Sequence, residues 1–456
     1  MFEKILIANR SEIAVRVIRA CREMGIKSVA VYSDADRESR HIAMADQAVC
    51  IGPAPSKLSY LDQEAILTAA KNTGADAIHP GYGFLSENAD FAQACAERGF
   101  TFIGPPPEAS RKLGFKSAGK AVALAANVPV VPGTKDDITT DVTDEVAKIG
   151  YPVLIKASAG GGGKGMRIVR APGELQAQLT AAANEAKAAF GDGSVFIEKL
   201  LERPRHVEIQ IAADKHGNVV AFAERDCTVQ RRHQKLVEES PSPAITPEIR
   251  REMQEAAIRL AKTSGYQNVG TVEFLFQDGK FYFIEVNARL QVEHPVTEAV
   301  AGVDLMELMI KIAAGDRLPF GQERAAEIRC HAIEHRINAE DPDNDFMPCP
   351  GKIASLELPG GPGVRVDTHV YEGYTIPSYY DSLIAKLIIT AADRASTLRR
   401  SLRALGELKV RGIKTTAGMH ALVVAHPVFQ KGDFDTHFIE KTGLLDRKQG
   451  GDHARP

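Results

Sequence analysis

The first hundred residues alternate between short apolar runs and segments with helical spacing, and this alternation constrains the fold more than any other feature. The apolar runs predict strands at residues 4–8, 28–32, 75–79 and 101–103. Apolar residues at helical spacing predict helices at 12–23 and 61–71, and Gly25 is expected to end the first. Strands that alternate with helices form parallel sheets with helices on both faces, so an α/β domain is expected here.

The rest of the chain has a different pattern. Residues 113–130 are Ala-rich and predict a helical linker, and residues 131–202 predict a smaller α/β unit. From residue 203 strands dominate, with helices predicted at 247–264 and 303–314. The expected domains are therefore 1–112, 113–130 as linker, 131–202 and 203–447, followed by a disordered tail at 448–456.

Composition excludes several classes of protein. The net charge is −3 with 25% charged residues, which favours neither nucleic-acid binding nor attachment to a membrane surface. No apolar stretch reaches the length of a membrane span, and the N-terminus lacks a signal-peptide pattern. None of the six cysteines forms a C-x-x-C pair, which argues against a zinc site and disulfides, so a reducing cytoplasm is expected.

Residues 283–293 (FIEVNARLQVE) alternate strictly between apolar and polar side chains. Period two predicts an extended strand whose one face carries Glu285, Asn287, Arg289, Gln291 and Glu293. A solvated outer strand would alternate too. The mixture of carboxylates, amides and a guanidinium is unusual for an exposed strand, and it favours a functional face.

The preceding strand, residues 271–276, carries one acid, Glu273. A two-residue turn at Asp278-Gly279 would place Glu273 and Glu285 on opposite faces, whereas a three-residue loop would place them on one face. We predict the three-residue loop. Two carboxylates on one face suit a divalent cation such as Mg²⁺ that is shared with phosphate.

Residues 151–170 contain a glycine run followed by Lys164, between two strand signals. Backbone N–H groups of glycines approach phosphate oxygens closely, so this segment predicts a phosphate-covering flap, with a flexible hairpin as the alternative. It is not a Walker motif, because no Ser or Thr follows the lysine. Lys156, on the preceding strand, is a second candidate phosphate contact.

Three further features remain open from the residues alone. The cationic run at 225–235 is either a solvated face or a loop that binds small anions. The segment Gly81-Tyr82-Gly83-Phe84 lacks the third glycine of a dinucleotide fingerprint, so a turn is predicted. His206 fits a core position or a site equally well.

Seven segments together resemble the biotin carboxylases of the ATP-grasp superfamily. They are IANRSEIAVRVIRAC, HPGYGFLSEN, GGGGKGMR, EKLLERPRHVEIQ, ERDCTVQRRHQK, FIEVNARLQVEHPVTE and RINAEDP, in order along nearly the whole chain. The resemblance implies α/β and α+β architecture: a Rossmann-like N-terminal domain, an ATP-grasp lid and a C-terminal ATP-grasp domain. ATP is expected between the last two.

The resemblance also implies roles for individual residues. The nucleotide contacts would be Lys116, Lys156, Gly161, Gly162, Gly163, Lys164, Glu198, Lys199, the backbone of Leu200, His206, Gln230, His233 and Glu273. Mg²⁺ (or Mn²⁺) would be held by Glu273 and Glu285 with Asn287 adjacent. Bicarbonate and biotin would contact Tyr82, Lys235, Arg289, Gln291, the backbone of Val292, Glu293 and Arg336. Among these, Glu293 would be the general base and Arg336 would stabilise the biotin enolate, with Lys235 and Arg289 also catalytic.

The implied reaction is the carboxylation of biotin by bicarbonate and ATP through carboxyphosphate. A base in this reaction needs a raised pKa or a neighbouring hydrogen bond. The chain contains no Met-Lys pair of a biotinyl domain, so biotin is expected on a separate carrier protein with a separate carboxyltransferase. Acetyl-CoA, another acyl-CoA or pyruvate would be the final acceptor, and the family implies a homodimer. The rival interpretations are another ATP-grasp ligase and a non-catalytic regulatory protein.

The chain departs from the family pattern at four positions. Ser11 stands where the family has glycine in NRGEIA, and Phe115 replaces an acid beside Lys116. Lys164 replaces an arginine of the flap, and Ala159 replaces a glycine. None of these departures removes a proposed catalytic group.

Overall fold

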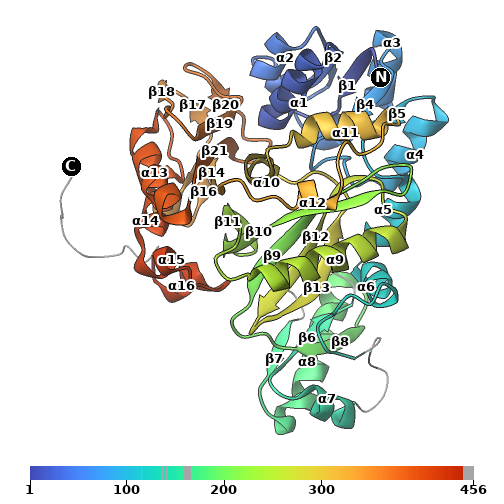
Figure 1. The fold of residues 1–456 in the computed structure, drawn as a ribbon, viewed down its shortest axis with the longest axis vertical. Helices are drawn as coiled ribbons and strands as arrows, with labels where there is room; N and C mark the ends of the chain where they lie inside the picture. The colour runs from blue at the N-terminus through green and yellow to red at the C-terminus, as the bar shows by residue number, and fades with distance from the viewer. Residues whose placement is uncertain (115, 135–137, 139–141, 159–165, 445–456) are drawn as a thin grey trace.

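The N-terminal part of the chain forms a five-stranded sheet (Figure 1). The structure is a computed structural model that describes residues 1–456 except 115, 135–137, 139–141, 159–165 and 445–456. The sheet order is β3 (Gln47–Gly52), β2 (Lys27–Ser33), β1 (Lys4–Ile7), β4 (Ala77–His79) and β5 (Thr101–Phe102), and every pair is parallel. The predicted parallel sheet is confirmed. Strand β3 was missed because it lies at the sheet edge and only one of its six residues is buried.

Helices connect and cover these strands. Their bounds are α1 (Ser11–Glu23), α2 (Arg40–Met44), α3 (Gln63–Thr73), α4 (Ala89–Glu97), α5 (Pro107–Gly114) and α6 (Lys116–Ala125). Helix α1 ends as predicted before Gly25, whose φ is +71°. Ser11 also has a positive φ, +63°, at the position where the family pattern has glycine. Its Oγ is 2.9 Å from Nδ1 of His369, a hydrogen bond that joins distant parts of the chain.

A three-stranded antiparallel sheet of order β7-β6-β8 makes the small unit at the bottom of Figure 1. Its strands are β6 (Val153–Ala157), β7 (Arg167–Val169) and β8 (Val195–Lys199), and its helices are α7 (Thr143–Ile149) and α8 (Leu175–Phe190). Val146, Val153, Ile155, Val169 and Ile197 form its separate core. The predicted glycine flap falls between β6 and β7, outside the described residues.

The centre of the molecule is an eight-stranded antiparallel sheet of order β13-β12-β9-β10-β11-β14-β21-β19. The strands are β9 (Arg205–Ala213), β10 (Val219–Arg231), β11 (Gln234–Ser240), β12 (Asn268–Gln277), β13 (Lys280–Asn287), β14 (His331–Asn338), β19 (Val364–Thr368) and β21 (Leu383–Ala391). Its helices are α9 (Pro247–Ser264), α10 (His294–Ala301), α11 (Leu305–Ala313), α12 (Gln322–Ala325), α13 (Arg394–Glu407), α14 (Ala417–Ala425), α15 (Pro427–Lys431) and α16 (Phe438–Lys441).

Short two-stranded ladders complete the C-terminal part. They are β15 (Glu340–Asp341) with β16 (Met347–Pro348), β17 (Gly351–Lys352) with β20 (Thr375–Ile376), and β18 (Ser355–Glu357) with β22 (Lys409–Arg411). One apolar cluster joins the N-terminal and central sheets, because Ile13 of α1 and Met309 of α11 pack with Phe222 of β10. None of the described helices is long and apolar enough to span a membrane.

The β12–β13 hairpin corrects the predicted loop. Gln277 pairs with Lys280, so the turn is the two-residue Asp278-Gly279, and both turn residues have positive φ (+52° and +75°). A register shift between the Glu273 and Phe274 pairs, however, leaves Ile284 as an extra residue in β13. This bulge reverses the effect of the shorter turn. Glu273 and Glu285 are therefore directly paired on one face, as expected, although by a different route.

The second correction concerns the length of the alternating strand. Strand β13 ends at Asn287, and residues 288–293 run irregularly into α10. Arg289, Gln291 and Glu293 are thus not on a strand. Their polar groups nevertheless lie near Glu273: Gln291 donates to it, and Glu293 shares Lys235 with it. Arg289 contacts Asn287, which also donates to Glu273.

Candidate active site

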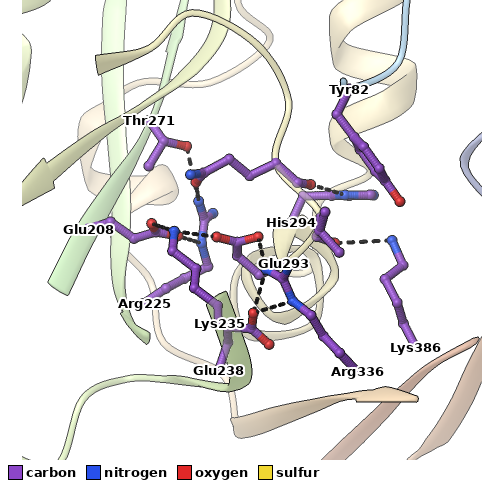
Figure 2. A network of polar contacts seen from close by, with 12 residues as sticks. Tyr82, Glu208, Arg225, Lys235, Glu238, Thr271, Glu293, His294, Arg336 and Lys386 are labelled. Carbon is purple, nitrogen blue, oxygen red and sulfur yellow. Dashed lines mark hydrogen bonds and ion pairs between the residues drawn. The ribbon is translucent and has the colours of Figure 1, made fainter. Parts of the chain in front are cut away.

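Lys235 of β11 lies at the centre of a buried polar network above the central sheet (Figure 2). Its Nζ is 2.7 Å from Glu208 of β9, 2.8 Å from Glu273 of β12 and 2.7 Å from Glu293. Burial alone would lower the pKa of this lysine, but the three carboxylates raise it well above its usual value. Lys235 is therefore a permanently charged group among three acids.

Glu293 lies between two cations. Its Oε1 accepts from Lys235, and its Oε2 lies 2.7 Å from Nη2 of Arg336. Burial would raise its pKa, but Lys235, Arg336 and Arg225 lower it well below the usual range. The sequence led us to expect a raised pKa or a neighbouring hydrogen bond. The structure provides the hydrogen bonds and not the raised pKa, so Glu293 is a weak base while both cations pair with it.

Arg225 of β10 supports the network from below. Its fully buried guanidinium donates to Glu208 at 2.5 Å, to Gln210 at 2.7 Å and to Gln291 at 2.6 Å, and also to Thr271 and Thr297. A buried guanidinium needs this many acceptors, so the cationic run at 225–235 is not simply a solvated face. Within this run the exposed residues are 232–234, at the hairpin turn, and Arg232 and His233 have positive φ.

Glu273 of β12 accepts hydrogen bonds from polar groups on three different segments. Its Oε1 accepts from Asn287 and Gln291, each at 2.8 Å, and its Oε2 is 2.8 Å from Nε2 of His206. His206 therefore lies at the site. Burial would lower its pKa, but Glu273 raises it. Ligand atoms of His206, Glu208 and Glu273 lie within 4.8 Å of one another, and Glu285 is paired with Glu273. This oxygen-rich donor set fits a hard divalent cation.

Arg289, Val292 and Tyr82 lie at the edge of the network. Arg289 contacts Oδ1 of Asn287 at 2.9 Å and Glu87 at 3.0 Å, and it is only half-buried. The carbonyl of Val292 accepts from Nζ of Lys386 at 3.0 Å. Lys386 is also 3.2 Å from Glu12, to which the Tyr82 hydroxyl donates. The Gly81–Phe84 segment forms a turn, as predicted.

A second polar cluster lies on the three-stranded sheet. Glu198 of β8 is 2.7 Å from Lys156 of β6 and 2.9 Å from Lys120 of α6. Lys199 instead donates to the carbonyls of Gly150 and Tyr151, and the N–H of Leu200 donates to Pro152. Gln230 pairs with Lys235 across the β10–β11 hairpin. Gly161, Gly162, Gly163, Lys164 and the side chain of Lys116 lie outside the described part of the chain.

Sequence reasoning missed several buried charges at this site. They are Glu208, Arg225, Glu238, Glu334 and Lys386, and the half-buried Lys120 of α6 was missed as well. A usable signal existed for most of them, because a charged residue within an otherwise apolar central strand needs a partner. The sequence pattern does not indicate which partner it finds.

The strands β6 and β7 of the small antiparallel sheet flank a glycine-rich segment in the sequence, and the larger antiparallel sheet carries Lys235 with the carboxylates of Glu208 and Glu273. This combination defines an ATP-grasp enzyme. Three family models match the chain: the biotin carboxylase N-terminal domain at residues 1–110, the carbamoyl-phosphate synthase L chain ATP-binding domain at 116–320, and the biotin carboxylase C-terminal domain at 334–441.

Individual relatives agree with the family models. The biotin carboxylase of Nostoc sp. is 54% identical, covering 96% of this chain and 99% of its own. The biotin carboxylase of Haemophilus influenzae is 53% identical, covering 97% and 99%. A Campylobacter jejuni biotin carboxylase structure superposes with a TM-score of 0.90 at 46% identity, covering 97% and 99%.

A further structure carries ligands. The biotin carboxylase domain of the Hydrogenobacter thermophilus 2-oxoglutarate carboxylase, solved with MgADP, ADP and bicarbonate, has a TM-score of 0.89 at 46% identity, covering 98% of this chain and all of that one. The chain belongs to the biotin carboxylase family and is an ATP-grasp ligase.

Proposed function

We propose that this protein carboxylates biotin, using ATP, Mg²⁺ or Mn²⁺ and bicarbonate, and releases carboxybiotin, ADP and phosphate. The observation that carries the proposal is the arrangement of Glu293 between Lys235 and Arg336, each 2.7 Å away. Two buried cations that pair with a carboxylate can shift part of that pairing to an incoming anion, which suits a base that acts on bicarbonate.

Bicarbonate binding would make Glu293 a stronger base. The anion would compete with Glu293 for the charge of Lys235, Arg336 and Arg289, so the pKa of Glu293 would rise from its lowered value. Glu293 could then take the bicarbonate proton. The deprotonated oxygen attacks the γ-phosphorus of ATP, the bond to ADP breaks, and carboxyphosphate forms. Lys235 stays close because Glu208 and Glu273 hold it independently of Glu293.

ATP would lie between the three-stranded sheet and the central sheet. Lys156 and Lys120 would exchange their pairing with Glu198 for contacts to the nucleotide, and His206 would face its phosphates. Glu273 and Glu285, with Asn287 adjacent, would hold the divalent cation. The cation supplies charge neutralisation on the phosphates. Gly161, Gly162, Gly163 and Lys164 would cover them and exclude water from labile carboxyphosphate.

The second half of the reaction needs a cation for an anionic biotin. Carboxyphosphate breaks down to CO₂ and phosphate, phosphate removes the biotin N–H proton, and the enolate attacks CO₂. Arg336 would stabilise that enolate. Glu238 would keep its hold on Nε of Arg336, 2.6 Å away, while Nη2 of Arg336 would leave Glu293 and become available to the enolate. Tyr82 would line the biotin side of the site.

We further propose the domain division 1–112, 113–130, 131–202 and 203–447, in support of which each of the three main sheets falls within one segment. The partners would be a biotin carrier protein, a carboxyltransferase and a second copy of the chain. The acceptor of the overall reaction would be acetyl-CoA, another acyl-CoA or pyruvate. A cytoplasmic location stays a prediction.

The test is ADP release from ATP, Mg²⁺ and bicarbonate, with and without free biotin. Turnover that needs bicarbonate, rises with biotin and is lost in Glu293→Gln is the expected result. Turnover that ignores both bicarbonate and biotin would contradict the proposal and indicate another ATP-grasp ligase. Absence of ADP release even with a biotinylated carrier would indicate a non-catalytic regulatory protein.

A further inference from the structure

Two carboxylates lie directly opposite each other behind Arg336. Glu238 of β11 and Glu334 of β14 are register partners on antiparallel strands, and both are 0% exposed. Directly opposed residues have Cβ atoms about 5 Å apart on one face of the sheet. Like charges at that distance, without water, are strongly unfavourable.

The hydrogen bonds of the pair are unequal. Oε1 of Glu238 accepts from Arg336 at 2.6 Å. Its Oε2 and both oxygens of Glu334 have no hydrogen-bond partner among the described residues. An ionised carboxylate that is fully buried and receives no donor is too costly to persist, so the pair can hold only one negative charge.

The surroundings do not supply a second cation for Glu334. Arg336, on the same strand, divides its donors between Glu238 and Glu293. Lys386 of β21 pairs with Glu12 and donates to the carbonyl of Val292. His294, at the start of α10, is buried, and burial lowers its pKa well below the usual value, so it is a neutral ring. The remaining charged group near Glu334 is Glu293, another acid.

We propose that Glu334 is a neutral carboxylic acid in the working enzyme and that, with the ionised Glu238, it is a positioning residue for Arg336. One charge on the pair suffices to hold Arg336 when Glu293 releases it. A second charge would tie Arg336 to the pair and weaken its attraction for a substrate anion. The positioning role of Glu334 rests on the proposed function, whereas its charge state does not.

The pKa values agree with this assignment. Burial raises the pKa of Glu238 to about 7, against the opposing effect of Arg336. Burial also raises the pKa of Glu334 well above its usual range, and Lys386 only partly offsets this. Of the two, Glu334 is thus the acid that keeps its proton at neutral pH.

Infrared difference spectra of the whole protein decide the charge state without any turnover. At about pH 8.5, above the pKa of Glu238, wild type should show the carbonyl band of a protonated carboxylic acid that shifts in heavy water, and Glu334→Gln should lack it. The control is Glu239→Gln, next to Glu238 on β11, because Arg394 and His331 keep that carboxylate ionised. Absence of the band in wild type, or its survival in Glu334→Gln, overturns the proposal.

Kinetics then test the positioning role. If ionisation of Glu334 weakens the action of Arg336, kcat of wild type should decline at alkaline pH. Glu334→Gln should keep kcat within about threefold of wild type, because an amide reproduces a neutral acid, and should lack that decline. Glu238→Gln should lower kcat about tenfold or more with little change in KM for ATP, because it removes a charged partner of Arg336. Equal losses in the two variants would contradict the assigned role. If wild type shows no biotin-dependent turnover, the proposed function fails, while the infrared result still decides the charge state.

Discussion

Nζ of Lys235 lies 2.7 Å from Oε1 of Glu293, and the same nitrogen also contacts Glu208 and Glu273. One lysine thus offsets the charge of three buried carboxylates that come from three different parts of the chain. Arg225 also pairs with Glu208 and Arg336 with Glu293, but Lys235 contacts all three acids, so the network depends on it for its stability as well as for its chemistry.

Replacement of Lys235 by Gln should therefore destabilise the protein as well as inactivate it. We expect the free energy of unfolding to fall by about 3 kcal/mol or more, because buried carboxylates lose their counter-charge. Urea unfolding measures this loss. Lys27→Gln is the control, since it removes an exposed pair with Asp46 and should change stability by less than about 0.5 kcal/mol. A Lys235→Gln variant as stable as this control would contradict the interpretation.

Stability should depend on pH through Glu238. Its pKa is about 7 in the folded protein and near 4.5 when unfolded, so between these values the folded state binds more protons. The contribution of Glu238 to the free energy of unfolding should consequently fall as pH rises through that window, by up to about 3 kcal/mol. Glu238→Gln should lack this slope in unfolding experiments at a series of pH values.

The neighbouring residue Glu239 provides a contrast of opposite sign. Burial would raise its pKa, but His331 and Arg394 lower it. Its stabilising contribution is present above the unfolded pKa of about 4.5 and lost as pH falls through the folded value. Equal pH profiles for Glu238→Gln and Glu239→Gln would be incompatible with the structure.

Ser11 should tolerate glycine better than alanine. Alanine keeps a Cβ at a φ of +63° and loses the hydrogen bond to His369, whereas glycine loses the same bond but removes the strain. We expect Ser11→Gly to be more stable than Ser11→Ala by about 1 kcal/mol. Thermal and urea unfolding of both variants measure the difference, and the reverse order would show that the backbone strain is unimportant.

Arg225 should not be replaceable by lysine. Its guanidinium makes five hydrogen bonds, and an ammonium group cannot reach all of these acceptors. Arg225→Lys should lose about 3 kcal/mol of stability and most activity, because Gln291 loses its donor. The matched control, Arg37→Lys, alters an exposed pair with Asp34 and should behave like wild type in both assays.

Local patterns placed α1, α3, α9 and α11 within about two residues, because apolar periodicity is itself the signature of burial, but α4, α8, α13 and α14 were not predicted individually. Helix α9 has the predicted bounds. The polar strand was predicted six residues too long, because the alternation continues beyond Asn287 while the backbone does not. Alternation indicates that side chains divide between two environments, and an irregular segment over a sheet can do this as well as a strand.

The partners of the site residues could not be predicted in the same way. The resemblance named Lys235 and Glu293, but their contact joins β11 to the irregular segment before α10, which is far away in sequence. The lowered pKa of Glu293 follows from that arrangement, as does the burial of Glu334 against Glu238. Such pairings are properties of the sheet register, which no local pattern contains.

The β12–β13 hairpin obeys a parity rule. Its turn has an even number of residues and its strand carries one inserted residue, Ile284, so two deviations cancel and the acids meet. A chain that lengthened the turn by one residue could keep the alignment of Glu273 and Glu285 only by losing the insertion. Among relatives, the length of the turn and the presence of the bulge are therefore expected to change together, as a single inherited unit, even where the residues themselves vary freely.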